Sequence, residues 1–299
     1  MKNFCNLCPR KCGVDRENTA GYCRAPREIM LARAALHHYE EPVISGTRGS
    51  GTLFFAGCNL GCVYCQNSAI SRLYPNKKTA ARIVDENELA EIIFRLENEG
   101  AHNINLVTPT HYSDILARVL TKVRHKLKIP IVYNCGGYES VETLRRLEGL
   151  VDIYMPDFKY FSSELSAKYS FVTDYSDRAA EALAEMYQQV GETVLRDDGI
   201  MQKGVLVRHL VLPGCRKDSA EVLKKIAETV PSDKILISIM RQYTPEFAPE
   251  NLKELRRRIT SFEYEFVLSE AEKYGFSGFS QDKESAEAVF TPDFYLKTF

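Results

Sequence analysis

The sequence lacks any long hydrophobic run and any excess of charge of one sign. Its longest unbroken apolar runs, such as residues 53–56, are four residues long, whereas a helix that crosses a bilayer needs about 20. We therefore expect no membrane span. Lys and Arg total 39 against 40 Asp and Glu, a formal net charge of -1, so no basic stripe favours binding to nucleic acid. These absences disfavour a membrane protein and a nucleic-acid-binding module.

The first residues, MKNFCNLCPRKCG, also lack the apolar stretch of a secretory signal, so we expect the protein to stay in the cytoplasm. Hydrophobic residues nevertheless make up 44% of the 299 residues, which suffices for a large core and excludes a mainly disordered chain. Nine cysteines are present, seven of them before position 66. Because cytoplasmic thiols stay reduced, clustered cysteines there favour metal binding or catalysis.

Short apolar runs alternate with helix-period segments from about residue 50 onward, a pattern typical of repeated βα units. Six strands are predicted, at 52–57, 104–109, 129–134, 152–159, 205–212 and 234–240, with helices between them, among others at 85–100, 113–123, 140–148 and 219–230. Because βα crossovers are nearly always right-handed, such units curl into a partial parallel (β/α)6 TIM-like barrel of the α/β class. We expect a cysteine-rich metal-binding segment at 1–49, this core at 50–243 and a helical C-terminal extension at 244–299.

Three cysteines, Cys58, Cys62 and Cys65, follow the first predicted strand in the spacing CxxxCxxC. A barrel builds its active site where its strands end, so this loop belongs at the predicted mouth. Three thiolates within eight residues can hold three corners of a 4Fe-4S cluster, and the missing fourth cysteine leaves one iron open to a ligand. The alternatives are a zinc site or simple packing, but structural zinc prefers four closed ligands.

With Tyr64 as its aromatic residue, this CxxxCx(aromatic)C loop resembles the defining motif of the radical S-adenosylmethionine (SAM) superfamily. The resemblance implies that SAM binds the open iron and that a donor such as flavodoxin or ferredoxin supplies one electron. It also implies that SAM is then cleaved to a 5′-deoxyadenosyl radical, which abstracts hydrogen from a substrate. From residue 51 to 243 the chain further resembles the pyruvate formate-lyase activating enzyme-like group, which implies an activase of a glycyl radical enzyme.

In that group an Asp-x-Lys on the fourth strand lies near cofactor and substrate, and Asp157 and Lys159 match it here. Arg208, five residues before Pro213-Gly214, resembles the group's Arg-x-x-x-x-Pro-Gly strand. Many members have a Gly-Gly-Glu turn for the SAM amino group where this chain has Thr-Pro-Thr-His at 108–111, although hydroxyls and carbonyls can accept the same hydrogen bonds. The expected cofactor contacts are Tyr64, Thr108, Thr110, Asn134, Asp157, Lys159 and Arg208, and the expected catalytic groups are Asp157, Lys159 and Cys135.

Four further cysteines, Cys5, Cys8, Cys12 and Cys23, lie in a loop-rich segment with little apolar content. Metal binding can supply folding free energy that such a segment lacks. Their spacing suits a closed zinc site or an auxiliary iron-sulfur cluster, and unligated thiols are the third alternative.

The expected function is therefore that of a radical SAM oxidoreductase, with activation of a glycyl radical enzyme as one possibility. The alternatives are radical modification of a small molecule or peptide, and a non-enzymatic iron-sulfur electron carrier. Shared folds host divergent functions, so the resemblance alone does not choose the substrate.

Overall fold

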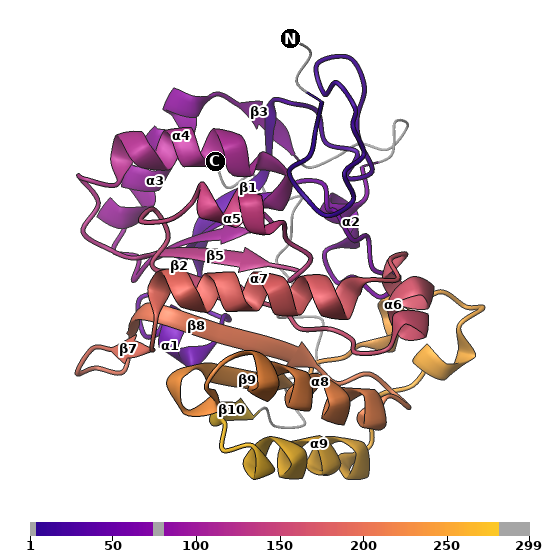
Figure 1. Ribbon diagram of the computed structural model, residues 1–299. Coiled ribbons are helices and arrows are strands. Elements are labelled where there is room, and N and C mark those ends of the chain that lie inside the picture. The colour runs from indigo at the N-terminus through magenta and orange to yellow at the C-terminus, as the bar shows by residue number, and fades with distance from the viewer. Residues whose placement is uncertain (1–3, 74–80, 281–299) are drawn as a thin grey trace.

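The structure is a computed structural model that describes residues 4–73 and 81–280. The chain forms one mixed sheet with helices on its outer face (Figure 1). Its strands are β1 (Ile29–His37), β2 (Ser50–Phe55), β3 (Arg82–Val84), β4 (Ile104–Val107), β5 (Ile131–Cys135), β6 (Ile153–Pro156), β7 (Val194–Leu195), β8 (Met201–Leu210), β9 (Leu236–Met240) and β10 (Ser277–Ser280). Its α-helices are α1 (Pro42–Ser45), α2 (Ser68–Ser71), α3 (Glu86–Asn98), α4 (Ser113–Val123), α5 (Val141–Arg145), α6 (Ser163–Ser170), α7 (Tyr175–Val190), α8 (Arg216–Thr229) and α9 (Ser261–Lys273).

All six predicted strands are present, as β2, β4, β5, β6, β8 and β9, and they pair in parallel in this order. Every residue of β2, β4, β5 and β6 is buried, as expected for parallel strands that are covered on both faces. The predicted α/β partial barrel is therefore confirmed. Its sheet runs from β10 at one edge to β3 at the other.

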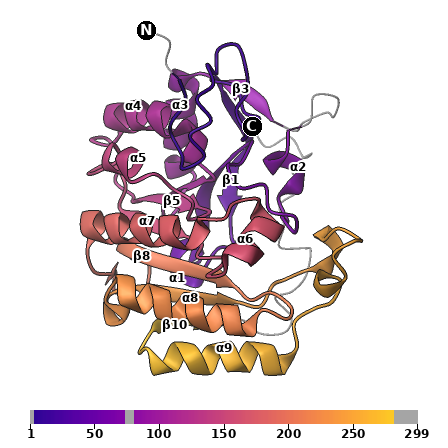
Figure 2. The same cartoon turned by 45° about the vertical axis from the view of Figure 1, so that its right-hand side comes forward.

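The predicted helices are also present, with boundaries that local contacts explain. Helix α3 begins after Asp85, whose carboxylate accepts from the N–H groups of Asn87 and Glu88 and so caps the helix. Helix α4 begins at Ser113, whose hydroxyl donates to the carbonyl of Thr110 in the preceding turn. Helices α3 and α4 lie at one end of the curved sheet and α8 and α9 at the other, as Figure 2 also shows.

Four strands, β1, β3, β7 and β10, lie in segments where the sequence did not predict a strand. Strand β1, within the expected cysteine-rich segment, pairs antiparallel with both β2 and β3. Strand β10, in the expected helical extension, pairs in parallel with β9, and α9 is the one α-helix of that extension among the described residues. No helix in the described part of the chain is long and apolar enough to cross a membrane.

The short helix α1 places an apolar layer inside the sheet. Its Val43 and Ile44 pack against Val132, Ile153 and Leu206, side chains of β5, β6 and β8. Because side chains alternate along a strand, the inward positions two residues farther along β5 and β8 are those of Asn134 and Arg208. A polar layer therefore follows the apolar one toward the ends of the strands.

Candidate active site

The three motif cysteines lie on the loop that follows β2. Cys62 is buried, and Cys58 and Cys65 are partly buried. Burial raises the pKa of Cys58 to about 12 and also raises that of Cys65, and the neighbouring motif thiols raise both further. All three thiols lie within eight consecutive residues. A bound metal centre would instead lower the pKa of these cysteines, because it binds them as thiolates.

Hydrogen bonds from the surrounding helices reach two of the motif sulfurs. The hydroxyl of Ser170, at the end of α6, lies 2.9 Å from Cys62 Sγ, and the hydroxyl of Ser71 lies 3.5 Å from Cys65 Sγ. Tyr64, the aromatic residue of the motif, is buried, and its hydroxyl lies 2.5 Å from that of Tyr160. Tyr64 thus anchors the loop in the core, with no contact that marks it as a cofactor group.

Cationic and anionic side chains meet in the polar layer. Asp157, just beyond β6, has Lys159 Nζ 2.5 Å from one carboxylate oxygen and Arg208 Nε 3.0 Å from the other. Arg208 also lies 2.7 Å from Asn134 Oδ1 and 3.3 Å from Glu40 Oε2. The structure therefore brings together four of the residues expected from the sequence and adds Glu40.

Gly137 allows the turn after β5 to contact the backbone of Asp157 in this layer. A Cβ at this position would lie 2.1 Å from the carbonyl oxygen of Asp157, and the residue has a φ of +79°, which glycine adopts freely. The turn after β5 can therefore pack directly against the backbone of Asp157.

The charges in this layer stabilise one another. Burial opposes the ionised form of Asp157, but Lys159 and Arg208 hold its pKa below the ordinary value. Burial likewise opposes the charge of Lys159 and Arg208, and the carboxylate of Asp157 raises the pKa of both above their ordinary values. Glu41, whose pKa burial raises, accepts a hydrogen bond from Ser238 at 2.9 Å. Two cations are thus fixed at the barrel mouth, and Lys159 is close enough to the motif to affect Cys65 electrostatically.

The two expected threonines have different surroundings. Thr108, just beyond β4, has a φ of +59°, a strained value for a β-branched residue that often marks a functional site. Its backbone N–H donates to the carbonyl of Asn134, so it lies beside the polar layer. Thr110 is fully buried, and its hydroxyl donates to Glu139 Oε1 at 2.7 Å. The structure does not bring Thr110 to the other expected contacts.

Cys135 also lies apart from that layer. It follows Asn134 directly on β5, so its side chain points to the opposite face of the strand. It is 2% exposed, and burial together with the charge of Glu139 raises the pKa of its thiol. Burial raises the pKa of Glu139 to about 7, in spite of hydrogen bonds from Thr110 and Tyr133 that lower it. The alternation of side chains along β5 thus places Cys135 on the outer face of the sheet, in a buried environment away from the polar layer.

Sequence reasoning missed Glu40 and Glu41, which lie before α1 and belong to no recognisable motif. In the sequence, only their position directly before the apolar residues of α1 could have pointed to them. In the structure, these apolar residues pack inside the barrel and bring the two glutamates with them. The two ring nitrogens of His209 contact the carbonyl of Phe158 and the hydroxyl of Ser219, and burial lowers its pKa to about 4.

The chemistry of the motif loop suits an iron-sulfur cluster, because three neighbouring thiols receive hydrogen bonds from Ser170, Ser71 and the backbone. Hydrogen bonds to ligating sulfurs are a regular means of tuning such clusters. Among the residues that the structure describes, no three His, Cys, Asp or Glu side chains already converge on one metal position. A cluster would therefore draw the thiols into their final orientation.

Comparisons with known proteins agree with this site. The sequence profile of the Radical SAM superfamily matches residues 52–200. An uncharacterised protein of Methanocaldococcus jannaschii is 31% identical over 276 residues, which is 90% of this chain and 75% of the relative.

Solved structures show the same fold. A radical SAM methyltransferase from Sphaerobacter thermophilus superposes with a TM-score of 0.52 at 14% identity, over 78% of this chain and 66% of that one. SuiB of Streptococcus suis, bound to its precursor peptide SuiA, superposes with a TM-score of 0.50 at 13% identity, over 75% of this chain and 46% of SuiB. This chain thus spans less than half of SuiB, and at such identities the likeness concerns the fold alone. The profile match and the motif after β2 show that the chain belongs to the radical SAM superfamily, whose enzymes bind SAM and a 4Fe-4S cluster.

Proposed function

We propose that Cys58, Cys62 and Cys65 hold the 4Fe-4S cluster with one iron open to SAM, and that the enzyme abstracts a hydrogen atom from a polypeptide. The observation that carries the cluster assignment is the position of this three-thiol loop at the end of β2, beside the cations of the polar layer. When bound and reduced, the cluster supplies the electron that cleaves SAM to a 5′-deoxyadenosyl radical.

In this proposal, side chains of the polar layer bind and orient the cofactor and the substrate. Lys159 is close enough to the motif to affect Cys65 electrostatically and would bind an anionic group of cofactor or substrate. Asp157 holds Lys159 and Arg208 in place, and Asn134 and Glu40 fix the remaining donors of Arg208. Asn134 is thereby a positioning residue. Thr108, with its strained backbone beside this layer, is the proposed contact for the amino group of SAM.

The open sheet supports a polypeptide substrate. Its two edge strands, β3 and β10, lie at opposite ends of the strand order, so within residues 4–73 and 81–280 the barrel is incomplete on one side. An activase must admit a loop of its partner enzyme to the radical, and an incomplete barrel is compatible with that. Activation of a glycyl radical enzyme is therefore our specific proposal, and modification of a small molecule or a peptide is the second candidate.

The test is anaerobic reconstitution, reduction with SAM present, and measurement of 5′-deoxyadenosine. We expect Cys58→Ala to lose cluster iron and product, and Cys215→Ala, a control at the start of α8, to keep both. If the loaded and reduced protein forms no 5′-deoxyadenosine with candidate substrates present, an electron carrier becomes the better interpretation. A glycyl radical detected by electron paramagnetic resonance in an added partner would support an activase, whereas product formation without one would favour the second candidate.

We also propose that the electron donor, a protein of the flavodoxin or ferredoxin type, docks outside Cys58. A hollow of about 410 Å³ lies there, lined among others by Arg24, Arg72, Tyr22 and Phe171, and the two aromatic side chains are exposed. Arginines attract an acidic partner, and such attraction weakens with salt. Arg24→Glu should slow cluster reduction by reduced flavodoxin but leave reduction by dithionite unchanged; equal rates with flavodoxin would contradict this docking site.

A further inference from the structure

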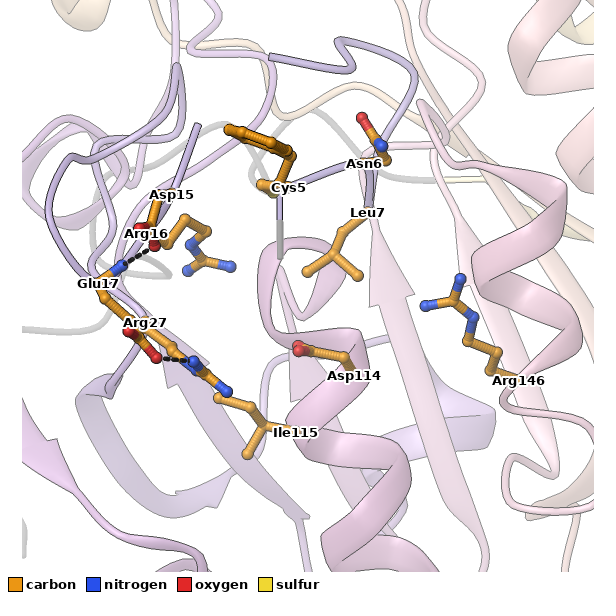
Figure 3. A pocket seen from close by; sticks show the side chains of 11 residues that line it. Cys5, Asn6, Leu7, Asp15, Arg16, Glu17, Arg27, Asp114, Ile115 and Arg146 are labelled. Atoms are coloured by element: carbon orange, nitrogen blue, oxygen red, sulfur yellow. Dashed lines mark hydrogen bonds and ion pairs between the residues drawn. The ribbon is translucent and has the colours of Figure 1, made fainter. Parts of the chain in front are cut away.

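The N-terminal segment, residues 4–27, packs against the loop that carries the cysteine motif. As with the motif thiols, no three of its four cysteines converge on one metal position within the described residues. The segment faces α4 across a hollow of about 360 Å³, which Arg27 lines (Figure 3). Toward the motif loop it extends a different arginine, Arg10, whose guanidinium group donates to backbone carbonyls of that loop.

The guanidinium group of Arg10 joins the motif loop to the end of α6. Its Nε donates to the carbonyl of Asn59 in the motif loop. Its two terminal nitrogens donate to the carbonyls of Ser170, the last residue of α6, and Phe171, each at 3.1 Å. Arginine suits this role because its planar group presents five N–H donors in a fixed geometry.

Both backbone segments that are held in this way also carry donors to the motif sulfurs. The carbonyl of Asn59 and the N–H of Leu60 belong to one peptide group, and this N–H donates to Cys58 Sγ at 3.4 Å. The hydroxyl of Ser170 donates to Cys62 Sγ at 2.9 Å. One guanidinium group therefore fixes the two donors that reach two different motif sulfurs.

Tyr22 restrains the same guanidinium group. The central carbon of the Arg10 guanidinium lies 3.3 Å from the centre of the Tyr22 ring, which is a cation–π contact. The hydroxyl of Tyr22 donates to the carbonyl of Leu60 at 3.1 Å. The ring and the hydroxyl of one tyrosine thus bind both the arginine and the loop that it holds.

We propose that Arg10 is a positioning residue that raises the reduction potential of the cluster, an inference that rests on the proposed function of the motif thiols. Hydrogen bonds to ligating sulfurs and nearby positive charge both favour the reduced, more negative cluster. A carbonyl that accepts from a cation also makes the N–H of its own peptide group a better donor. Arg10 therefore acts on the cluster through Leu60 and Ser170, while its own donors bind carbonyls.

The experiment is a redox titration of the reconstituted protein, followed by electron paramagnetic resonance of the reduced cluster. We expect Arg10→Gln to disfavour reduction by about tenfold, which lowers a one-electron potential by about 59 mV. Arg27→Gln is the matched control, because it removes the same charge from the same segment at a residue that pairs with Glu17 on the surface. A change of less than about twofold for Arg10→Gln, or an equal change for Arg27→Gln, would overturn the proposal.

Two further variants separate positioning from charge. Arg10→Lys keeps the charge but loses the planar fork, so it should still lower the potential, though by less. If Arg10→Gln does not retain the cluster, Arg10→Lys decides in its place, and an unchanged potential would overturn the proposal. Because Arg10 acts in part through Ser170, the shifts of Arg10→Gln and Ser170→Ala should be less than additive in the double variant; full additivity would refute the positioning role.

Hydrogen exchange on the cluster-free protein tests the contacts themselves. Arg10→Gln should speed exchange in residues 59–62 and leave α9 unchanged, and Arg10→Lys should restore part of the protection. Unchanged exchange in residues 59–62 would show that Arg10 does not hold the loop. This result is distinct from a failure of the proposed function, in which the wild-type protein itself binds no cluster on reconstitution.

Discussion

Replacement of Asp157 by Asn tests the charge balance of the barrel mouth. The carboxylate lies between Lys159 at 2.5 Å and Arg208 at 3.0 Å, and all three side chains are 16% exposed. Removal of one partner of a buried ion pair costs about 3–5 kcal/mol, because the other charge stays buried and unpaired. Arg208 keeps Glu40 and Asn134, so the low end, about 3 kcal/mol, applies here.

The assay is equilibrium unfolding in urea under anaerobic conditions, with wild type and Asp157→Asn compared at constant salt. Asp198→Asn is the matched control, because Asp198 forms an ion pair with Arg196 on the surface, and it should cause no measurable loss. A loss below about 1 kcal/mol for Asp157→Asn is the size seen for solvent-screened pairs. That result would refute the argument that the mouth is a buried, mutually compensated charge layer.

The pH dependence gives a second check with a definite sign. The pKa of Asp157 is lowered in the folded state, so its stabilising contribution is present above the unfolded-state pKa of about 3.9 and is lost as the pH falls through the folded pKa. The difference between wild type and variant should therefore be constant above about pH 5 and shrink below about pH 4. A difference that instead grows on acidification would contradict the assigned charges.

Three further predictions concern single side chains. Because burial raises the pKa of Glu139 to about 7, wild-type stability should fall as the pH rises from about 4.5 to 7, and Glu139→Gln should flatten this slope in urea unfolding. Ser170→Ala removes the hydrogen bond to Cys62 Sγ and should lower the cluster potential in a redox titration, whereas Ser166→Ala on the same helix should not. Thr108→Gly should relieve the strained φ of +59° and stabilise the fold by about 1 kcal/mol in the same unfolding assay; a loss would show that the threonine side chain contributes more than its strain costs.

The barrel strands could be predicted because burial on both faces leaves a continuous apolar run in the sequence. Strand β5 reads IVYNC, with Asn134 close to its C-terminal end, and β9 reads LISIM, with Ser238 as its one polar residue. Strand β1 could not be found in this way. Its sequence, IMLARAALH, has no clean alternation, and its antiparallel pairing with β2 is a tertiary contact that local pattern does not encode.

The site residues, like the strands, could be predicted in part from the sequence. Asp157, Lys159, Arg208 and Asn134 were found because a motif or a strand end marks them, and they meet in one polar layer. Cys135 was selected by its strand end as well, but a shift of one residue along β5 reverses the side-chain direction. A prediction accurate to one or two residues at a strand boundary cannot settle which face a side chain occupies.

The backbone of the motif loop indicates how its charge is offset. The carbonyls of Asn59, Leu60, Gly61 and Cys62 all accept hydrogen bonds from side chains outside the loop. Most of these donors are the guanidinium groups of Arg10 and Arg72, so the contacts that fix the loop also bring positive charge to it. Lys159 adds a third cation from the barrel side. Three thiolates on one short loop repel one another, and a loop surrounded by cations lowers the cost of holding them together once the metal binds.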